Sequence, residues 1–188
     1  MLSIKGLQKT SLIDYPDLIS TVVFLSGCNL NCPYCHNPDL INKSLPTIKE
    51  EDVLNYLETK KQWIDAVVIS GGEPSLHKEL PDFLKKIKQL SLKVKIDTNG
   101  TKPLFLKELI EKNLVDYIAM DIKAPLNKYN KVTKAKVNTK DIEKSIEIIK
   151  NSNIDYEFRL TCVPSLIDKK DIENIGKLLK NSKMFYLQ

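Results

Sequence analysis

Strand-like and helix-like patterns alternate along nearly the whole of this 188-residue chain. Short runs rich in β-branched and aromatic residues have the length of ordinary strands, and segments with helical periodicity separate them. The strand-like runs occupy residues 21–26, 66–70, 93–97, 117–122, 156–163 and 183–187. Such alternation requires parallel strands joined by right-handed crossovers. Six such units are too few to close an eight-stranded barrel.

The helix-like segments carry apolar stripes that predict packing against the sheet. Thr47 and Glu50 are spaced as a capping box, which predicts that a helix begins there, and Asp168 is expected to cap the last helix. The stripes comprise Val53, Leu54 and Leu57; Leu80, Phe83, Leu84 and Ile87; Leu106, Leu109 and Ile110; Ile142, Ile146 and Ile149; and Ile172, Ile175 and Leu179. The short apolar alternations of residues 1–20 predict a hairpin or extended arm ahead of the main fold.

Composition and charge exclude several classes of protein. No apolar run approaches the ~20 residues of a membrane span, and without a signal peptide or linker we expect one cytoplasmic domain, residues 1–188. Lysine supplies 28 of the 29 basic residues, and the net charge of +5 is spread along the chain. This mild excess does not predict nucleic-acid binding, although it suits docking of an acidic electron donor. Residues 124–137, with four lysines, are expected to form a solvated, mobile loop, with contact to a partner as the alternative.

Three of the four cysteines lie directly after the first strand-like run. Cys28, Cys32 and Cys35 are close enough in sequence to bind one metal centre, whereas Cys162 is far away. A [4Fe-4S] cluster normally has four thiolate ligands, so three leave one iron without a protein ligand unless Cys162 folds back. An open iron can bind a substrate or cofactor.

Structural zinc is the alternative reading of these cysteines. Zinc prefers four ligands, commonly as two CxxC pairs or as Cys2His2. The second pair is missing here, and His36, next to Cys35, is poorly placed to bind the same ion. A disulfide is disfavoured because few cysteines and no signal peptide indicate a reducing compartment. The spacing favours an iron-sulfur cluster and leaves zinc open.

The cysteine run resembles a known family. Cys28-Asn-Leu-Asn-Cys32-Pro-Tyr-Cys35 is similar to the CxxxCxφC signature of radical S-adenosylmethionine (radical SAM) enzymes, with Tyr34 as the aromatic residue. The run Ser-Leu-Ile-Asp-Tyr-Pro at residues 11–16 and the His-Asn-Pro run at 36–38 resemble the activating proteins of anaerobic ribonucleoside-triphosphate reductase. Pyruvate formate-lyase activating enzymes share some of these features. The resemblance implies a (βα)6 partial TIM barrel with a short N-terminal hairpin or arm.

Candidate site residues follow the strands, because sites in parallel α/β folds form at the carboxyl ends of strands. The run at residues 70–74, Ser-Gly-Gly-Glu-Pro, is a weak turn signal alone, although its glycines allow close approach of backbone to a ligand. It resembles the GGE motif of radical SAM enzymes. The resemblance implies that Gly71, Gly72 and Glu73 bind the amino group of the methionine moiety of SAM.

Two further strand ends carry charged residues. Read alone, the Asp-Thr-Asn-Gly run at 97–100 is a turn, and Asp121 with Lys123 is an ion pair. Both runs resemble stretches in glycyl-radical-enzyme activases. That resemblance implies Asp97 and Asp121 as ligands of a monovalent cation beside SAM, with Asn99 and Lys123 as SAM contacts. A lysine beside a carboxylate keeps its charge and can hold the methionine carboxylate.

The remaining candidates are single residues. Arg159, the only arginine, suggests bidentate binding of a SAM carboxylate or ribose edge, or a bridge between two acids on the barrel rim. By the resemblance, Tyr34 packs over the cluster and the His36 backbone meets adenine. Cys162 is expected to be a small buried hydrophobe, and His77 a solvated loop residue.

The resemblance implies a complete reaction. The three cysteines would hold a [4Fe-4S] cluster, SAM would chelate the fourth iron, and a flavodoxin or ferredoxin-type donor would supply one electron. Cleavage of SAM would yield a 5′-deoxyadenosyl radical that takes hydrogen from a glycine of the partner, anaerobic ribonucleotide reductase. The alternatives are a radical SAM enzyme acting on a small deazapurine or pterin-like molecule, and a zinc-stabilised binding module.

The chain departs from the resemblance in two places. Asp17 stands where relatives often have glycine, which puts the turn of the arm in doubt but not the chemistry. Residues 184–188 resemble a strand with nothing behind it, so we expect either a truncated chain or a barrel that is short at that edge.

Overall fold

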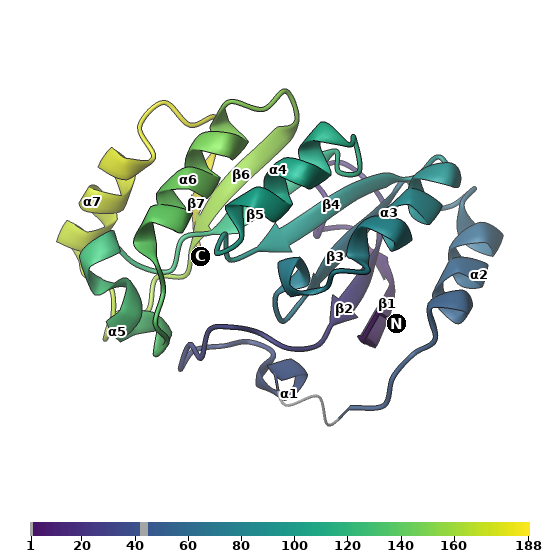
Figure 1. Ribbon diagram of the computed structural model, residues 1–188, viewed down its shortest axis with the longest axis horizontal. Coiled ribbons are helices and arrows are strands. Elements are labelled where there is room, and N and C mark those ends of the chain that lie inside the picture. The colour runs from purple at the N-terminus through teal and green to yellow at the C-terminus, as the bar shows by residue number, and fades with distance from the viewer. Residues whose placement is uncertain (1, 42–44) are drawn as a thin grey trace.

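A computed structural model describes residues 2–41 and 45–188, and a seven-stranded sheet organises this part of the chain (Figure 1). The strands lie in sequence order across the sheet, β2 to β7 are parallel, and β1 pairs antiparallel with β2 at one edge. Their bounds are β1 Ile4–Ser11, β2 Ser20–Leu25, β3 Ala66–Gly71, β4 Lys93–Thr98, β5 Tyr117–Asp121, β6 Asp155–Leu160 and β7 Phe185–Leu187. The six expected parallel strands are confirmed, and the N-terminal arm is an edge strand, β1.

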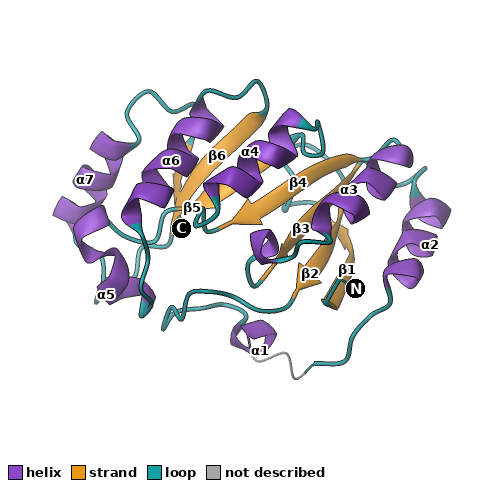
Figure 2. Ribbon diagram, viewed as in Figure 1, coloured by secondary structure: helices purple, strands orange, loops and turns teal. Residues whose placement is uncertain are grey.

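Helices follow the parallel strands, as expected for βα units. They are α1 Pro38–Ile41, α2 Glu50–Lys60, α3 Leu80–Gln89, α4 Pro103–Glu111, α5 Tyr129–Thr133, α6 Thr139–Lys150 and α7 Lys169–Leu178, with 3-10 turns η1 Pro74–Leu76 and η2 Leu126–Lys128. Figure 2 shows α3, α4 and α6 covering one face of the sheet. None of the helices in the described ranges is long and apolar enough to cross a membrane.

Side-chain alternation divides the sheet into two faces. Residues such as Ile96, Ile118 and Phe158 belong to the large apolar core that includes the helix stripes, and all three are fully buried. Their neighbours in sequence, including Asp97 and Arg159, point to the other face. The helix-facing side is therefore the core, and the inner face is free to carry polar groups.

The β1–β2 loop covers the inner face near the amino ends of the strands. Tyr15 packs on Tyr117, with ring centroids 5.5 Å apart, and both belong to a second, smaller apolar cluster. Lys95 Nζ donates to the backbone oxygen of Asp14 at 2.6 Å. The Ser-Leu-Ile-Asp-Tyr-Pro run thus closes the floor of the inner face, away from the carboxyl ends.

Two expectations about local structure are wrong, and one is confirmed. The capping box does not form, because α2 begins after Lys49 without a side-chain cap and Thr47 Oγ1 accepts from Lys5 Nζ instead. The expected loop at 124–137 contains η2 and α5. Asp168 does cap α7, in a reciprocal capping box with Asp171.

Two glycines at the end of β3 allow its backbone to lie directly against the backbone at the end of β2. Gly72 N donates to Leu25 O at 2.8 Å, and Glu73 N donates to Gly27 O at 2.7 Å. A Cβ on Gly72 would lie 1.9 Å from Gly27 O, and Gly71 has φ of 117°. The close partner of these glycines is therefore the end of β2, which seats the cysteine loop next to β3.

We expect Gly72→Ala to destabilise the protein by roughly 1–3 kcal/mol, because the new methyl overlaps backbone that cannot move aside. Gly176→Ala in α7 is the matched control, since no described atom outside the backbone of its own helix lies within 4 Å of its Cβ position. That change should stabilise by about 0.5–1 kcal/mol. Urea unfolding followed by circular dichroism measures both. Equal effects of the two substitutions would contradict the assigned role of Gly72.

Candidate active site

One cavity of about 460 Å³ lies at the carboxyl ends of the parallel strands. Every residue that the sequence predicted for the site lines it: Cys28, Cys32, Tyr34, Cys35, His36, Gly71, Gly72, Glu73, Asp97, Asn99, Asp121, Lys123 and Arg159. Sequence reasoning missed Ser70, Thr98, Thr161 and Gln188, which also line it. Each of these four lies at or just after the end of a strand, so the strand-end rule applied to every strand would have found them.

The cysteine loop is fixed at several points along its backbone. Gly27 N donates to Leu40 O at 2.7 Å, and Asn31 N donates to Thr133 O at 2.9 Å. Leu30 N donates to Cys28 Sγ at 3.4 Å. The loop is therefore held between α1 and α5, with its thiols turned to the cavity.

All three thiols are free and partly exposed. Burial raises the pKa of Cys28, and it raises the pKa of Cys32 against the opposing charge of Lys123. Within residues 2–41 and 45–188, no three His, Cys, Asp or Glu side chains are arranged to hold a single metal ion. The ligands of an iron-sulfur cluster bind different irons and need not converge on one point.

Glu73 is buried and receives hydrogen bonds from three sides. Its Oε1 accepts from the backbone N and hydroxyl of Ser75 and from Thr98 Oγ1, and its Oε2 accepts from Asn99 N at 2.7 Å. Burial raises the pKa of this carboxyl, although the four donors act in the opposite direction. Glu73 thus ties β3, η1 and the end of β4 together.

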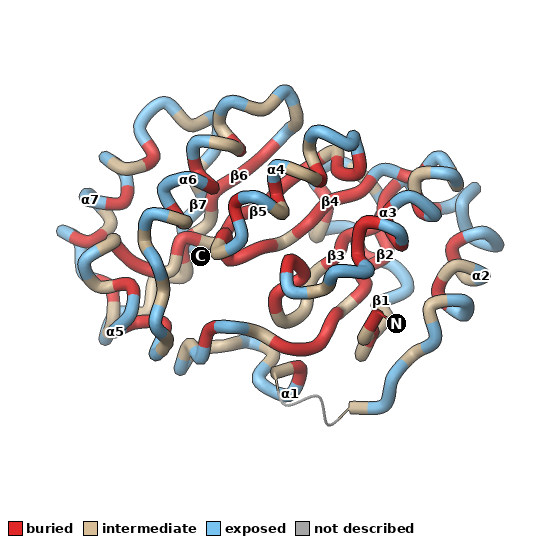
Figure 3. The backbone as a smooth tube through the Cα atoms, in the orientation of Figure 1, coloured by how far each residue is buried: buried red, intermediate tan, exposed pale blue. Residues whose placement is uncertain are grey.

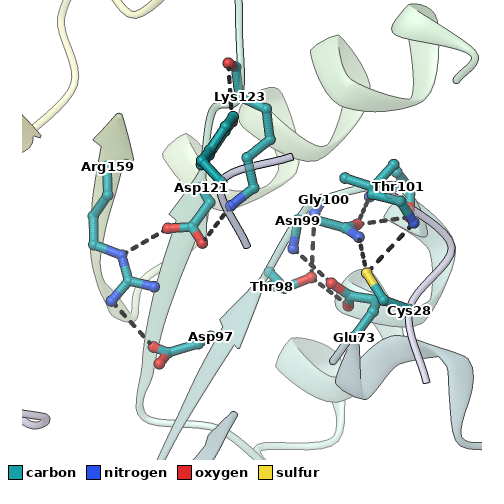
Figure 4. Close-up of polar contacts among 12 residues, drawn as sticks. Cys28, Glu73, Asp97, Thr98, Asn99, Gly100, Thr101, Asp121, Lys123 and Arg159 are labelled. Carbon is teal, nitrogen blue, oxygen red and sulfur yellow. Dashed lines mark hydrogen bonds and ion pairs between the residues drawn. The ribbon is translucent and has the colours of Figure 1, made fainter. Parts of the chain in front are cut away.

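A second group of polar contacts links the end of β4 to the cysteine loop (Figure 4). Asn99 Nδ2 donates to Asn29 Oδ1 at 2.9 Å and lies 3.9 Å from Cys28 Sγ. Thr101 Oγ1 accepts from Asn29 Nδ2 at 2.8 Å and donates to Asn99 Oδ1 at 2.7 Å. Asn29 and Thr101 were not predicted, because their role exists only when the two loops meet.

Charged side chains line the opposite wall of the cavity. Arg159 Nε donates to Asp121 Oδ1 at 2.8 Å, and Arg159 Nη1 lies 3.5 Å from Asp97 Oδ1. Lys123 Nζ donates to Asp121 Oδ2 at 2.9 Å. Arg159 therefore bridges two acids and Asp121 pairs with Lys123, as the residues read alone had suggested.

The pKa values follow from this pairing. Burial by itself would raise the pKa of Asp121, but Lys123 and Arg159 outweigh it and hold that pKa below its usual value. Burial by itself would lower the pKa of Lys123, but Asp121 raises it above its ordinary value. All three groups therefore stay charged at neutral pH.

A buried layer supports these groups from below. Lys95, with a side chain only 3% exposed, lies 3.3 Å from Asp97 Oδ1 and 3.8 Å from Glu157 Oε1. Tyr117 donates to the other oxygen of Glu157 at 2.8 Å. Among the described residues, Asp97 Oδ1 accepts no hydrogen bond despite its two cationic neighbours. Asp97 Oδ1 is thus a buried acceptor that is held by charge, between Lys95 and Arg159, rather than by a hydrogen bond.

Two expected side chains, His77 and Cys162, have different surroundings from those predicted. His77 is half-buried and its Nε2 lies 2.8 Å from Ser26 O, so it braces the start of the cysteine loop rather than being solvated. Cys162 is half-buried rather than fully buried and does not line the cavity. Tyr34 directs its hydroxyl to Lys123 O at 3.5 Å.

A pH-dependent measurement tests the brace at Glu73. Because its folded-state pKa is raised by burial, its contribution to stability is complete below the ordinary carboxyl pKa and is lost as pH rises through the raised value. Glu73→Gln cannot titrate and turns an amide donor toward Asn99 N. We expect it to cost about 1–3 kcal/mol in mild acid and less toward neutral pH.

Urea unfolding at several pH values measures this difference. Glu58→Gln, an exposed change on α2, should alter stability by no more than about 0.5 kcal/mol. A cost for Glu73→Gln that grows toward neutral pH would contradict the assignment.

Comparison with known proteins places this geometry in a family. Residues 22–179 match the Radical SAM superfamily. The chain is 38% identical over 190 residues to a protein of Methanocaldococcus jannaschii named as a glycyl-radical enzyme activating enzyme, covering 98% of this chain and 78% of that protein. It is 34% identical over 187 residues to the pyruvate formate-lyase-activating enzyme of Clostridium pasteurianum, covering 95% of this chain and 76% of that enzyme.

Solved structures share the fold. Streptococcus suis SuiB superposes with a TM-score of 0.70 at 17% identity over 88% of this chain, which spans 38% of SuiB. The radical SAM enzyme HemN of Escherichia coli superposes with a TM-score of 0.56 at 12% identity over 88% of this chain, which spans 43% of HemN. The expected α/β architecture of the partial TIM-barrel type is confirmed. The chain therefore belongs to the radical SAM superfamily and, within it, to the glycyl-radical enzyme activating enzymes.

Proposed function

We propose that this protein cleaves SAM reductively at a [4Fe-4S] cluster and generates a glycyl radical on an anaerobic ribonucleoside-triphosphate reductase. The observation that carries the proposal is that the cysteine loop and the runs after β3, β4 and β5 meet in one cavity. Family membership implies the cluster and SAM. The choice of reductase rests on the resemblance of residues 11–16 and 36–38.

The residues present fit an iron-sulfur cluster. Cys28, Cys32 and Cys35 are soft ligands from one braced loop, and Cys162 does not line the cavity, so three thiolates are available and one iron is left open to SAM. When bound, the cluster supplies the electron that divides SAM into methionine and a 5′-deoxyadenosyl radical. A zinc-stabilised binding module is not supported, because the family is one of radical SAM enzymes.

The cavity wall provides complementary groups for SAM. Lys123 and Arg159 present cationic donors that suit the methionine carboxylate. Asp97 lines the cavity beside Arg159 and adds negative charge to this wall. Gly71 and Gly72 offer backbone to the amino group, and Glu73 lines the cavity beside them with an Oε2 that accepts a single protein donor, so it stays the expected acceptor for that group.

Other family-derived roles stay predictions of the same kind. Tyr34 and the His36 backbone line the cavity and are expected to shield the cluster and meet adenine. A monovalent cation between Asp97 and Asp121 would have to share both carboxylates with Arg159, which already bridges them. The cation is therefore expected only if Arg159 turns to SAM.

The partner enters where the cavity opens. Residues 11–16 lie at the floor and stabilise it through Tyr15, so they identify the family without facing the glycine of the partner. The reductase must reach the cavity from the carboxyl ends of the strands. A flavodoxin or ferredoxin-type donor would supply the electron.

We expect Cys32→Ala to abolish SAM cleavage and to lower cluster content after anaerobic reconstitution. Cys162→Ala is the matched control and should retain about four irons per chain and full cleavage, because Cys162 is outside the cavity lining. The measurements are the iron and sulfide content per chain and the amount of 5′-deoxyadenosine formed with dithionite as the reductant. One zinc, no iron and no cleavage in the wild type would refute the cluster.

Mixing the reduced enzyme and SAM with an anaerobic ribonucleotide reductase should produce the doublet of a glycyl radical in EPR. Pyruvate formate-lyase is the comparison partner, since a relative bears the name of its activating enzyme.

A 7-carboxy-7-deazaguanine synthase of Aquifex aeolicus is 38% identical over 92 residues, 49% of this chain. Cleavage that depends on an added deazapurine precursor, without a doublet, would favour the small-molecule alternative.

A further inference from the structure

The excess charge is not spread along the chain as its composition suggested, because one stretch carries all of it. Residues 122–140 contain six lysines and no acidic residue, while the whole chain has a net charge of +5. The rest of the chain is therefore close to neutral. Lys131, Lys134 and Lys136 of this stretch are exposed, and we call these three the α5 lysine patch.

Two other lysines of the stretch have charge partners of their own. Lys123 lies in the cavity and pairs with Asp121. Lys128 Nζ lies 2.7 Å from Asp171 Oδ2 at the start of α7. The sixth lysine, Lys140, is exposed in the first turn of α6. The patch is thus the set of exposed lysines in and just after α5.

The segment that carries the patch is held in place by packing. Tyr129 is completely buried, and its hydroxyl accepts from Lys123 N at 3.3 Å. Val132 and Thr133 are also buried, and Val137 N donates to Asn130 Oδ1 at 2.8 Å. Figure 3 shows both buried and exposed positions along α5. The lysines therefore extend from a fixed platform, which reduces the conformational entropy lost on docking.

The patch adjoins the loop that would hold the cluster. Asn31 N donates to Thr133 O at 2.9 Å, and Asn31 precedes Cys32 directly. In Figure 1 the chain leaving β2 runs to α5 before it turns back to α1. A protein docked on the patch would lie beside the cysteine loop.

We infer that the α5 lysine patch docks a small acidic electron-transfer protein. This inference rests on the proposed function, because each cleavage of SAM consumes one electron from outside. The donor is oxidised by one electron and the cluster is reduced by one, and no other reactant enters this step. Opposite charges steer such encounters and raise their association rate.

The geometry favours a donor over other partners. A protein whose glycine is attacked must enter the cavity itself, whereas an electron donor needs only to approach the cysteine loop from outside. A nucleic acid would require a longer basic surface that follows its backbone. Three lysines beside a redox loop suit a compact acidic protein better.

The test compares two triple charge reversals in anaerobically reconstituted protein. The first is Lys131→Glu with Lys134→Glu and Lys136→Glu. The matched control reverses Lys60, Lys93 and Lys180, which are exposed near the amino ends of the strands. The probe is a purified acidic ferredoxin, and the readouts are its dissociation constant by calorimetry and the rate at which it reduces the cluster by stopped flow.

We expect the patch reversal to weaken ferredoxin binding and slow reduction at least about tenfold at low salt, and to remove most of the salt dependence. The control should change neither by more than about twofold. SAM cleavage with dithionite, a small reductant, should be unchanged in both. A variant with glutamine at the same three positions should show an intermediate loss of ferredoxin binding. Because it removes the charges without reversing them, it controls for misfolding of the Glu variant.

Equal weakening by both reversals, or no weakening by the patch reversal, would overturn the inference. Loss of glycyl radical formation with dithionite would also overturn it, because the patch would then bind the partner reductase. The inference would also be overturned if the patch reversal abolished binding of a fluorescent oligonucleotide and left ferredoxin binding unchanged. If the wild type binds ferredoxin through the patch but cleaves no SAM with dithionite, the proposed function fails while the docking surface stands.

Discussion

The backbone junction between β2 and β3 is the constraint on which the site depends. Gly72 N and Glu73 N continue the parallel hydrogen bonding past the strands, onto Leu25 O and Gly27 O. No side chain fits at Gly72, so the cysteine loop begins at a fixed position next to the GGE run. Glu73 then connects this junction to the end of β4, because its Oε2 accepts from Asn99 N. A cluster bound by the cysteines would inherit its position from these contacts.

Charge compensation is the second requirement of the inner face. Taking Asp97, Asp121 and Arg159 out of water is costly unless each charge meets an opposite one. Arg159 pairs with both acids, by a hydrogen bond to Asp121 and by charge alone to Asp97, and Lys95 and Glu157 complete the balance from below. The cationic groups that suit SAM are thus held in advance by acids. A ligand that replaces a carboxylate beside Lys123 meets a donor that is already oriented.

The functions proposed for this chain separate along the axis of the strands. The floor at the amino ends is closed by Tyr15 and Asp14. The cavity lies at the carboxyl ends, and α5 stands beside it through the contact of Asn31 with Thr133. This separation allows a protein substrate to enter the cavity while an electron donor approaches from the side. It also explains how residues 11–16 can mark a family without contacting its substrate.

Much of the architecture was predictable because its determinants are local. The alternating strand and helix patterns identified six strands. The proposed cavity residues followed from the spacing of Cys28, Cys32 and Cys35 and from the rule that sites form at strand ends. Predictions failed where a distant partner decides the outcome. Thr47 has the spacing of a capping residue, but Lys5 takes its hydroxyl. The lysine-rich stretch was predicted to be a loop because it has no apolar stripe of its own. In the fold, Tyr129 is buried against the core and α5 forms around it.

The sequence by itself determined the fold class, the thiol set and the family, since periodicity, residue type and spacing are written along the chain. Only the tertiary structure decided how these residues are used. Glu73 is a brace because two segments, η1 and the end of β4, direct donors at it. Arg159 bridges Asp97 and Asp121 because β4, β5 and β6 are neighbours in register. Such roles depend on distances between segments far apart in sequence, and those distances exist only after packing.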